Sequence, residues 1–435
     1  MKNLYCKTHF SFIIALLLVS FISSCAKKAT TTPNSTPDGD SGVINVPDPV
    51  IYGISPQSGL PNTVIKISGS SFNTTPGSTI VYLNDLQMPI SSITSTQITV
   101  TVPATANSGQ LVLRTGTAQL QSPVSFTVMY GTVDDFISIG GGNQLKHLAL
   151  DRQENAFSDN GTSIYKILSD GRTQPITSST GDFKAIADFT ILAIGDMYVA
   201  NAGNFNIVKI TPDKTATVFA GNGTQGYADG TGTAAKFSAI TGITHDVLGN
   251  LYVNDAHRVR KISTAGVVTT IAGNGTDGYA NGKGADAQFG NLEGIAIDDE
   301  GTIYVTDREF RNIRRISADG VVTTLAGSGA TGLVDGAGVA AQFTNPRQLA
   351  IDLAGNIWVT DENPSLPVYE VREINKLGLV TTFIKGTSNA GVLTGPAFSA
   401  SVNSPLGMMF DPAGNLYIAN TGARVISKVT FYAIK

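Results

Sequence analysis

Residues 298–307 read DDEGTIYVTD, and near copies of this stretch recur through the second part of the chain. Three clear copies are DVLGNLYVND at 246–255, DLAGNIWVTD at 352–361 and DPAGNLYIAN at 411–420, and two weaker ones lie at 154–160 and 195–201. The glycine of the repeat recurs every 52 to 59 residues from Gly195 to Gly414. A period of this length is typical of proteins built by repetition of one supersecondary unit.

Each copy carries four strand-like segments joined by tight turns. In the copy at 298–307 these segments are residues 294–298, 303–305, 312–316 and 321–325. Asp-Gly and Gly-Asn pairs stand at the turns, where they tolerate the positive φ angles that tight hairpins require. Radial repetition of four-stranded sheets protects strand edges and gives a β-propeller. Six copies therefore predict an all-β fold with a six-bladed propeller.

The two ends of the repeat region complement each other. The sixth copy stops after residues 426–429 and lacks an evident outer strand. The segment VDDFISIG at 133–140, just before the first copy, has the pattern of that missing strand. We therefore predict that the propeller is closed by an N-terminal outer strand in its last blade.

The repeat pattern resembles NHL repeats, and the resemblance covers residues 134–435. It implies a six-bladed propeller of the NHL type. Propellers similar to this one include metal-dependent lyases, and related six-bladed propellers include calcium lactonases. Because one fold hosts binding proteins and enzymes alike, the resemblance leaves the function open.

Residues 49–128 alternate apolar and polar residues in short runs, which predicts antiparallel strands. About 80 residues with this spacing suit an immunoglobulin-like sandwich. The segments ISPQSG at 54–59, VIKISG at 64–69 and VTVP at 100–103 resemble the IPT/TIG family. Domains of that family occur as spacers and as binding modules. The segment has neither histidine nor cysteine, so we expect a spacer.

Residues 1–24 have the features of an export signal, with Lys2 and Lys7 before an apolar run at 10–22 that is short for a membrane span. The run ends in Ile22-Ser-Ser-Cys25, which resembles the lipobox of bacterial lipoproteins and implies that Cys25 is lipidated. Residues 25–48 are rich in Thr, Pro, Ser and Asp and predict a flexible tether. We expect an outer-membrane lipoprotein held by its lipid anchor, facing either the periplasm or the cell surface.

The charge of the chain argues against a nucleic-acid partner. Charged residues make up 14% of the chain and the net charge is −4, whereas a nucleic-acid binder presents a basic face. The polar, weakly charged composition suits a carbohydrate or a protein partner better.

Candidate binding residues lie at the start of the inner strands. The start of each inner strand and the end of the second strand share one propeller face, because the two strands run antiparallel. At the inner-strand starts the residue type changes from copy to copy, whereas a structural position would repeat one type. The polar members are Lys146, His147, Asp188, Glu293, Arg347 and Gln348. A solvated rim without a ligand remains the alternative.

Three copies are preceded by an insertion that ends in Ala-x-Phe, and we expect Phe237, Phe289 and Phe343 to plug the interfaces between blades. Tyr227 and Tyr279 in these insertions have the chemistry to stack on a sugar ring, and equally to support their own loops. The second strands end in Asp or Asn, which we expect to cap their own loops through local hydrogen bonds.

These observations favour a non-catalytic binding module for glycans or for a surface protein complex, with no cofactor. The alternative is a metal-dependent lyase or hydrolase that acts at the channel mouth. Its zinc or calcium would need several ligands, and the nearest equivalents are His147, Asp188 and Glu293. No Gly-x-Ser-x-Gly elbow for a serine hydrolase is present in the sequence.

Overall fold

The computed structural model describes residues 48–139, 145–176, 183–363, 365–387, 394–397 and 400–433. These residues form β-strands and four short 3-10 helices. The predicted signal, Cys25 and the tether up to residue 47 lie outside the described residues. In the part of the chain that is described, no helix is long and apolar enough to cross a membrane.

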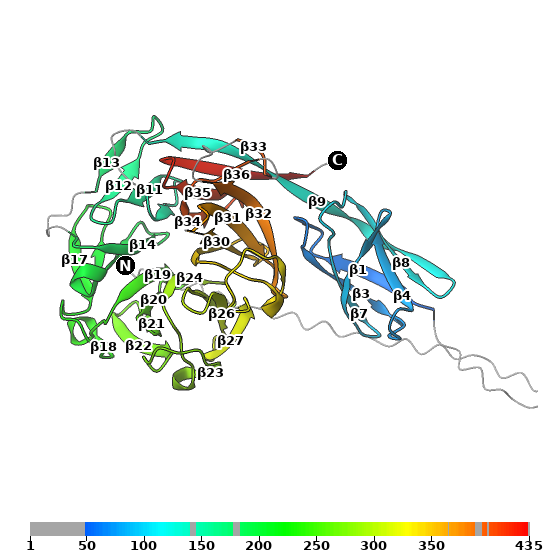
Figure 1. The fold of residues 1–435 in the computed structure, drawn as a ribbon, viewed down its shortest axis with the longest axis horizontal. Coiled ribbons are helices and arrows are strands. Elements are labelled where there is room, and N and C mark those ends of the chain that lie inside the picture. Colours follow the sequence, from blue (N-terminus) through cyan, green and yellow to red (C-terminus); the bar gives the residue numbers. More distant parts are fainter. Residues whose placement is uncertain are drawn as a thin grey trace, which may run out of the picture. The chain divides into compact units, whose positions relative to one another are not determined.

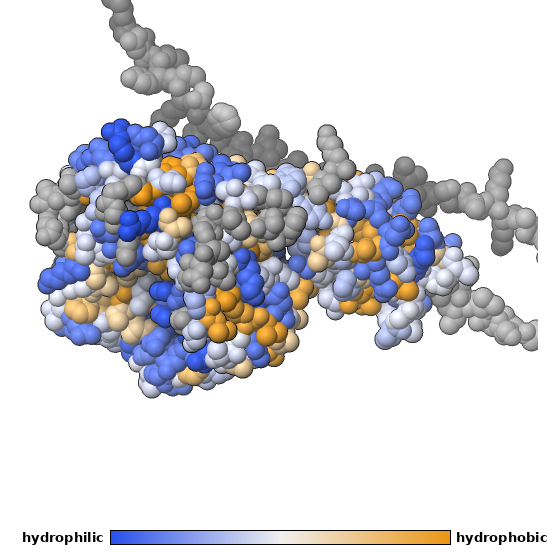
Figure 2. Space-filling model, turned by 45° about the horizontal axis from the view of Figure 1, so that its top comes forward, coloured by the Kyte–Doolittle hydropathy of each residue, from blue (hydrophilic) through white to orange (hydrophobic). Residues whose placement is uncertain are grey.

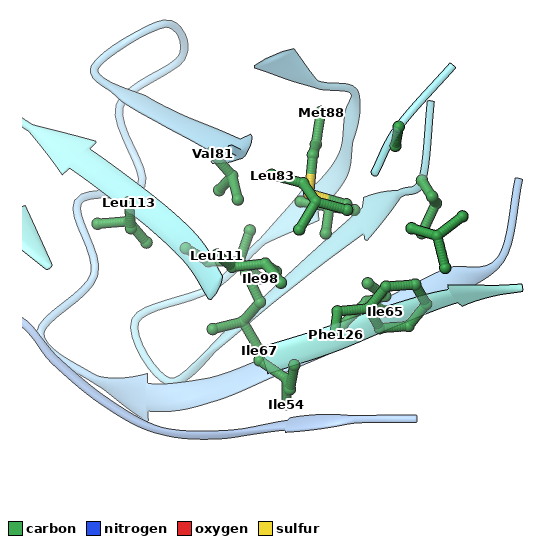
Figure 3. Packing of buried hydrophobic residues seen from close by; sticks show 14 of the residues in the cluster. Ile54, Ile65, Ile67, Val81, Leu83, Met88, Ile98, Leu111, Leu113 and Phe126 are labelled. Carbon is green, nitrogen blue, oxygen red and sulfur yellow. The ribbon is translucent and has the colours of Figure 1, made fainter. Parts of the chain in front are cut away.

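The N-terminal unit is a sandwich of two antiparallel sheets (Figure 1). The first sheet consists of β1 (Val50–Ser55), β3 (Val64–Ser70), β7 (Gln97–Thr101) and β6 (Ile90–Ile93), in that order. The second consists of β5 (Leu86–Met88), β4 (Thr79–Leu83), β8 (Gly109–Thr115) and β9 (Ala118–Ser138), and β2 (Ser58–Gly59) pairs with β9 in parallel. Alternate side chains of both sheets, such as Ile65, Ile67 and Val81, fill the core between them (Figure 3).

The described residues from 145 onward, together with the C-terminal part of β9, form six four-stranded blades, which follow one another around a ring in Figure 1. Blades 1 and 2 are β10 (Leu148–Leu150), β11 (Ala156–Asp159), β12 (Ile164–Ile167), β13 (Thr173–Pro175), then β14 (Ile186–Ile191), β15 (Met197–Asn201), β16 (Asn206–Ile210) and β17 (Ala216–Ala220). Blades 3 and 4 are β19 (Ile240–His245), β20 (Leu251–Asp255), β21 (Arg258–Ile262), β22 (Val267–Ala272), then β24 (Leu292–Ile297), β25 (Ile303–Asp307), β26 (Asn312–Ile316) and β27 (Val321–Ala326). Blades 5 and 6 are β29 (Pro346–Ile351), β30 (Ile357–Asn363), β31 (Val368–Ile374), β32 (Leu379–Thr387), then β34 (Pro405–Phe410), β35 (Leu416–Asn420) and β36 (Val425–Ala433) with β9.

Short elements complete the connections between blades. Two-residue strands add to the outer edges of blades 3 to 6: β18 (Gly230–Thr231), β23 (Gly282–Lys283), β28 (Gly336–Ala337) and β33 (Gly395–Pro396). The 3-10 helices are η1 (Ala202–Asn204), η2 (Gly232–Ala234), η3 (Gly284–Asp286) and η4 (Gly338–Ala340).

The predicted closure is confirmed, because β9 forms the outer strand of blade 6. It pairs antiparallel with β36 from Ser138 opposite Val425 to Met129 opposite Ala433. The pairing therefore begins before the predicted segment at 133–140, and one strand continues from the sandwich into the ring without a break. Val133 of β9 is fully buried among residues of blades 5 and 6. The ring thus has no free edge at its junction.

The apolar cores of the propeller lie between neighbouring blades. Phe237 packs with Tyr198 and Ile207 of blade 2 as well as Val253 of blade 3, and Phe289 and Phe343 occupy the corresponding places one and two blades further on. The predicted role of these three residues as plugs is confirmed. The inner strands contact one another in turn around the ring, and β10 meets β34 to complete the circle.

Candidate functional site

The inner strands surround a channel that opens into a cavity of about 550 Å³, here called the mouth cavity. Four predicted binding residues line it: Lys146, His147, Glu293 and Arg347. Lys146 and His147 immediately precede β10, while Glu293 and Arg347 lie near the starts of β24 and β29. His257 and Arg308, which follow the second strands of blades 3 and 4, line the cavity as well. The starts of the inner strands and the ends of the second strands thus lie on one face of the propeller, as strand direction predicted.

Five polar side chains beside the mouth cavity form a closed ring of four hydrogen bonds and one ion pair. Arg347 donates from Nε to Glu293 Oε1 (2.7 Å) and from Nη1 to Glu362 Oε1 (3.0 Å). Asn345 donates to the same oxygen of Glu362 (2.6 Å) and accepts from Arg308 Nε (2.7 Å). Arg308 Nη1 in turn lies 2.7 Å from Glu293 Oε2. Because each member is held by two others, the ring fixes the arginines before any ligand arrives.

The charges that line the mouth cavity are mainly positive. Glu293 is the one carboxylate in the lining and pairs with two arginines. Behind the lining, Glu362 pairs with Arg347 and Asp159 pairs with His147, so the positive charge left over is mainly that of Lys146. Lys146 forms no ion pair with any residue that the structure describes, so its ammonium is available to a ligand. His257 donates from Nδ1 to the carbonyl oxygens of Phe289 and Gly290, and Nε2 takes no part in these two hydrogen bonds. The arrangement favours a ligand that carries negative charge.

His147 is buried at the innermost part of the mouth cavity and pairs with a carboxylate. Its Nδ1 lies 2.7 Å from Asp159 Oδ2, and Asp159 also accepts from the backbone of Gly161. Burial lowers the pKa of His147, but the charges of Asp159 and Asp188 outweigh it and raise the pKa to about 9. The imidazole is therefore cationic at neutral pH. Burial also raises the pKa of Asp188 to about 6, against hydrogen bonds that it accepts from Phe189 and Ile243.

Deeper in the channel, a second cavity of about 590 Å³ is lined by Asp188, Gln348 and again His147. Gln348 is 6% exposed, and its Nε2 has no hydrogen-bond partner among the described residues. The other three positions of this level are glycines, and at Gly294 a Cβ would lie 2.4 Å from the carbonyl oxygen of Arg347. Glycine therefore occurs at this level where neighbouring inner strands pack too closely for a side chain. The three polar residues, His147, Asp188 and Gln348, remain candidates for binding.

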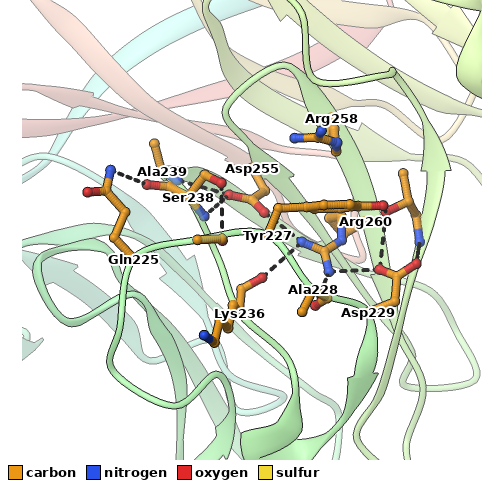
Figure 4. Close-up of polar contacts among 12 residues, drawn as sticks. Gln225, Tyr227, Ala228, Asp229, Lys236, Ser238, Ala239, Asp255, Arg258 and Arg260 are labelled. Carbon is orange, nitrogen blue, oxygen red and sulfur yellow. Dashed lines mark hydrogen bonds and ion pairs between the residues drawn. The ribbon is translucent and has the colours of Figure 1, made fainter.

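The two insertion tyrosines lie outside both cavities. The ring of Tyr227 lies between two guanidinium groups, with Arg258 Cζ 3.8 Å and Arg260 Cζ 4.9 Å from its centroid (Figure 4). Its hydroxyl contacts Thr270 Oγ1 at 3.1 Å. Tyr279 contacts Thr324 Oγ1 and packs beside Arg314 and Phe310. These contacts support the reading in which the tyrosines buttress loops, and a sugar would have to displace an arginine to stack on Tyr227.

Three buried arginines are the main feature that sequence reasoning missed. Arg260 is fully buried and its guanidinium contacts Asp255 Oδ2 (2.6 Å), Asp229 Oδ1 (2.8 Å) and the carbonyl oxygens of Ala228 and Lys236 (Figure 4). Equivalent contacts are made by Arg314 in blade 4 and Arg372 in blade 5. The signal was present in the sequence, because these arginines occur in the same blades as the insertions.

At the ends of the second strands, Asn160 caps its own loop as predicted, accepting hydrogen bonds from the backbone of Thr162 and Ser163. The aspartates at these ends are also structural, but those of blades 3 and 5 have other partners than predicted. Asp255 accepts hydrogen bonds from the backbone of Ser238 and Ala239, which precede the inner strand of the same blade. Asp361 accepts from Thr344 and Asn345 in the same way. These carboxylates therefore join the insertion to its blade, whereas a bond to the following loop is seen for Asp307 with Phe310.

The surface view in Figure 2 shows hydrophilic residues interspersed with small groups of apolar ones. Among the most exposed apolar residues, Leu248 and Leu353 lie in the turns between inner and second strands, at the end of the channel opposite to the mouth cavity. No group of three or more His, Cys, Asp or Glu side chains suited to hold a metal ion occurs among the described residues.

Stability is expected to fall as the pH rises from about 6.5 to 9. The raised pKa of His147 means that the folded state holds a proton that the unfolded chain releases at lower pH. The stabilisation is fully present below the ordinary histidine pKa and is lost as the pH passes about 9. Thermal denaturation of wild type and His147→Gln across this range measures it. Between about pH 6.5 and 9 we expect the free energy of unfolding to fall by up to about 3 kcal/mol more in the wild type than in His147→Gln. If the two proteins lose stability in parallel over this range, the raised pKa of His147 is contradicted.

Comparison with known proteins supports the two-part architecture. Residues 49–128 match the model of the IPT/TIG domain family, and residues 275–433 match that of the Teneurin NHL domain. The Arabidopsis thaliana protein SUPPRESSOR OF QUENCHING 1, chloroplastic, is 30% identical over 188 residues, which are 40% of this chain and 18% of that protein. The chain thus spans less than a fifth of the length of this relative.

Two solved structures from Bacteroides thetaiotaomicron share the fold over most of the chain. A structural genomics protein of unknown function has a TM-score of 0.55 and 16% identity, and covers 88% of this chain and 98% of its own. An auxiliary nutrient binding protein has a TM-score of 0.53 and 18% identity, and covers 88% and 97%. At these identities the similarity shows the fold alone, and the two family models describe its parts: an immunoglobulin-like domain followed by an NHL-like propeller.

Proposed function

We propose that the propeller is a non-catalytic binding module whose ligand enters the mouth cavity and is polar and negatively charged. The observation that carries the proposal is the set of cations that line this cavity, of which Lys146 has no ion-pair partner among the described residues and Arg347 is held in place by Glu293 and Glu362. The fold shared with a nutrient binding protein agrees with a binding role. A carbohydrate or a surface protein complex would supply such a ligand.

A thermal-shift screen of sugar acids, neutral sugars and small carboxylates tests this proposal. We expect an acidic compound to raise the melting temperature of the wild type and to lose at least about tenfold in affinity in Lys146→Ala and Arg347→Ala, because each variant removes one cation from the cavity. Tyr227→Ala is the matched control and should keep the affinity, since Tyr227 does not line the cavity. Equal affinity in all four proteins would contradict a site at the mouth.

The enzymatic alternative is a metal-dependent lyase or hydrolase at the same mouth. His147, Asp188 and Glu293 are its candidate ligands, but the contacts of His147 with Asp159 and of Glu293 with two arginines already occupy these groups. Metal analysis of the purified protein separates the two proposals. Stoichiometric zinc or calcium that is lost in His147→Ala and Glu293→Ala would favour the enzyme.

We further propose that the protein is an exported outer-membrane lipoprotein anchored through Cys25. The proposal is supported by the export signal and lipobox-like ending at residues 1–25. Two or more acyl chains give stable anchoring where one does not. Mass spectrometry of the N-terminal peptide should find a lipidated Cys25 in the wild type, and Cys25→Ser should release the protein from the membrane fraction; an unmodified Cys25 in membrane-bound protein would contradict it.

A further inference from the structure

A third cavity adjoins the mouth cavity on the same face. It has a volume of about 590 Å³ and shares Asn291 and Arg308 with the mouth cavity. Its remaining residues come from the loops of blades 4 and 5, so it extends outward from the channel between these two blades. We call it the lateral cavity. The two cavities therefore adjoin at Asn291 and Arg308, and the lining of the mouth cavity also includes apolar residues such as Ile240, Leu292 and Leu406.

Polar side chains line the whole lateral cavity. Its hydroxyl groups belong to Thr331, Thr344 and Ser365, and the other lining residues are Asn, Arg or Glu. These groups offer hydrogen-bond donors and acceptors along the cavity to a polar occupant.

The lining also identifies the chemistry of that occupant. No aliphatic or aromatic side chain lines the lateral cavity, so it offers no apolar pocket for the side chains of a peptide. Hydroxyl and amide groups that both donate and accept hydrogen bonds suit a ligand rich in hydroxyl groups. Cations line both cavities: Arg308 and Arg311 line the lateral cavity, and Lys146 and Arg347 line the mouth cavity.

Size indicates that the ligand has several units. A cavity of roughly 300–1,000 Å³ holds one drug-sized ligand. Here two cavities of about 550 and 590 Å³ adjoin and share the lining residues Asn291 and Arg308. The hydrogen-bonded ring of Arg308 and Asn345 lies where they meet, so the boundary between the cavities is rigid and polar.

We infer that the mouth cavity and the lateral cavity form one groove for a linear acidic oligosaccharide, with a carboxylate-bearing unit at the mouth and further units along the lateral cavity. This inference rests on the proposed binding function and specifies its ligand. Cations in both cavities supply the charge recognition, and the hydroxyl and amide groups of the lateral cavity supply the hydrogen bonds to hydroxyl groups. Affinity should therefore depend on chain length as well as on charge.

Calorimetric titration with uronic-acid oligomers of increasing length, and with neutral gluco-oligomers of the same lengths, tests the inference. We expect the acidic oligomers to gain at least about tenfold in affinity from monomer to tetramer, and the neutral ones to bind more weakly at every length. Thr331→Trp and Ser365→Trp place a bulky ring in the lateral cavity from exposed positions. Both should abolish the gain with length and leave the affinity for the monomer unchanged.

The matched control is Asp277→Trp, because Asp277 pairs with Phe289 as Thr331 pairs with Phe343 one blade later, and Asp277 lies outside both cavities. It should keep the gain with length. If length and Thr331→Trp have no effect while Lys146→Ala still weakens binding, the groove is wrong and the site at the mouth stands. If acidic peptides bind and the acidic oligomers do not, the ligand class is wrong.

Discussion

Arg372→Met should reduce the free energy of unfolding of the propeller by about 3–5 kcal/mol, the usual cost of breaking one side of a buried ion pair. Arg372 is 0% exposed, and its guanidinium contacts Asp361 Oδ2 at 3.2 Å and Asp335 Oδ1 at 2.8 Å. It also donates to the carbonyl oxygens of Gln342 and Val334. Methionine has a similar length but no donor, so the variant leaves these acceptors unpaired within the blade interface.

Denaturant titration followed by tryptophan fluorescence measures this loss. The chain has one tryptophan, Trp358, which is buried in the same blade and therefore reports on the propeller. Arg258→Met is the control: Arg258 covers Tyr227 at the surface and donates to Asn274, and we expect its loss to cost about 1 kcal/mol or less. Arg372→Met with a loss of that smaller size would contradict the structural role of the buried arginines.

Val133→Asp should open the ring. Val133 is 0% exposed, pairs with Val429 of β36 and packs with Trp358. An unpaired carboxylate at this position costs several kcal/mol or forces the strand out of the blade. We expect a loss of at least about 4 kcal/mol in propeller stability. The amides of Val425–Ala433 that bond to β9 should exchange rapidly, because that side of β36 would become an exposed edge, whereas the amides that bond to β35 should stay protected.

Asp135→Ala is the control for closure, since Asp135 is exposed on the same strand and should be replaceable at little cost. The immunoglobulin-like domain provides an internal reference. Its core is a separate cluster that includes Phe126 and Val128 but not Val133, so its exchange protection should persist in Val133→Asp. Retained protection in that variant of the β36 amides that bond to β9 would mean that β9 does not hold the ring.

The repeat made most of the fold predictable. Each copy has the same turn chemistry and the same strand spacing, and Asp298 accepts hydrogen bonds from the backbone of Thr302 exactly where Asp246 accepts them from Asn250. These contacts are local, so a stretch of about ten residues is enough to predict them. Closure was predictable for a related reason, because a missing strand at one end matched an extra strand at the other.

The candidate site was only partly predictable. Strand direction placed Lys146, His147, Glu293 and Arg347 at the mouth, since antiparallel geometry depends on the repeat alone. Strand direction could not show that Tyr227 lies outside the mouth cavity. The ring of Tyr227 is covered by two arginines that come from the next blade, and this contact appears only in the folded structure.

The amino-acid sequence determined the kind and number of repeating units, their order and the face on which the variable residues gather, because periodicity and turn chemistry act within a few residues. The tertiary structure alone decided which charges meet. One closed ring of four hydrogen bonds and one ion pair forms between two blades only when their inner strands pack side by side; its members are Glu293, Arg308, Asn345, Arg347 and Glu362. Contacts across that distance depend on packing, and the shape and charge of the groove follow from them.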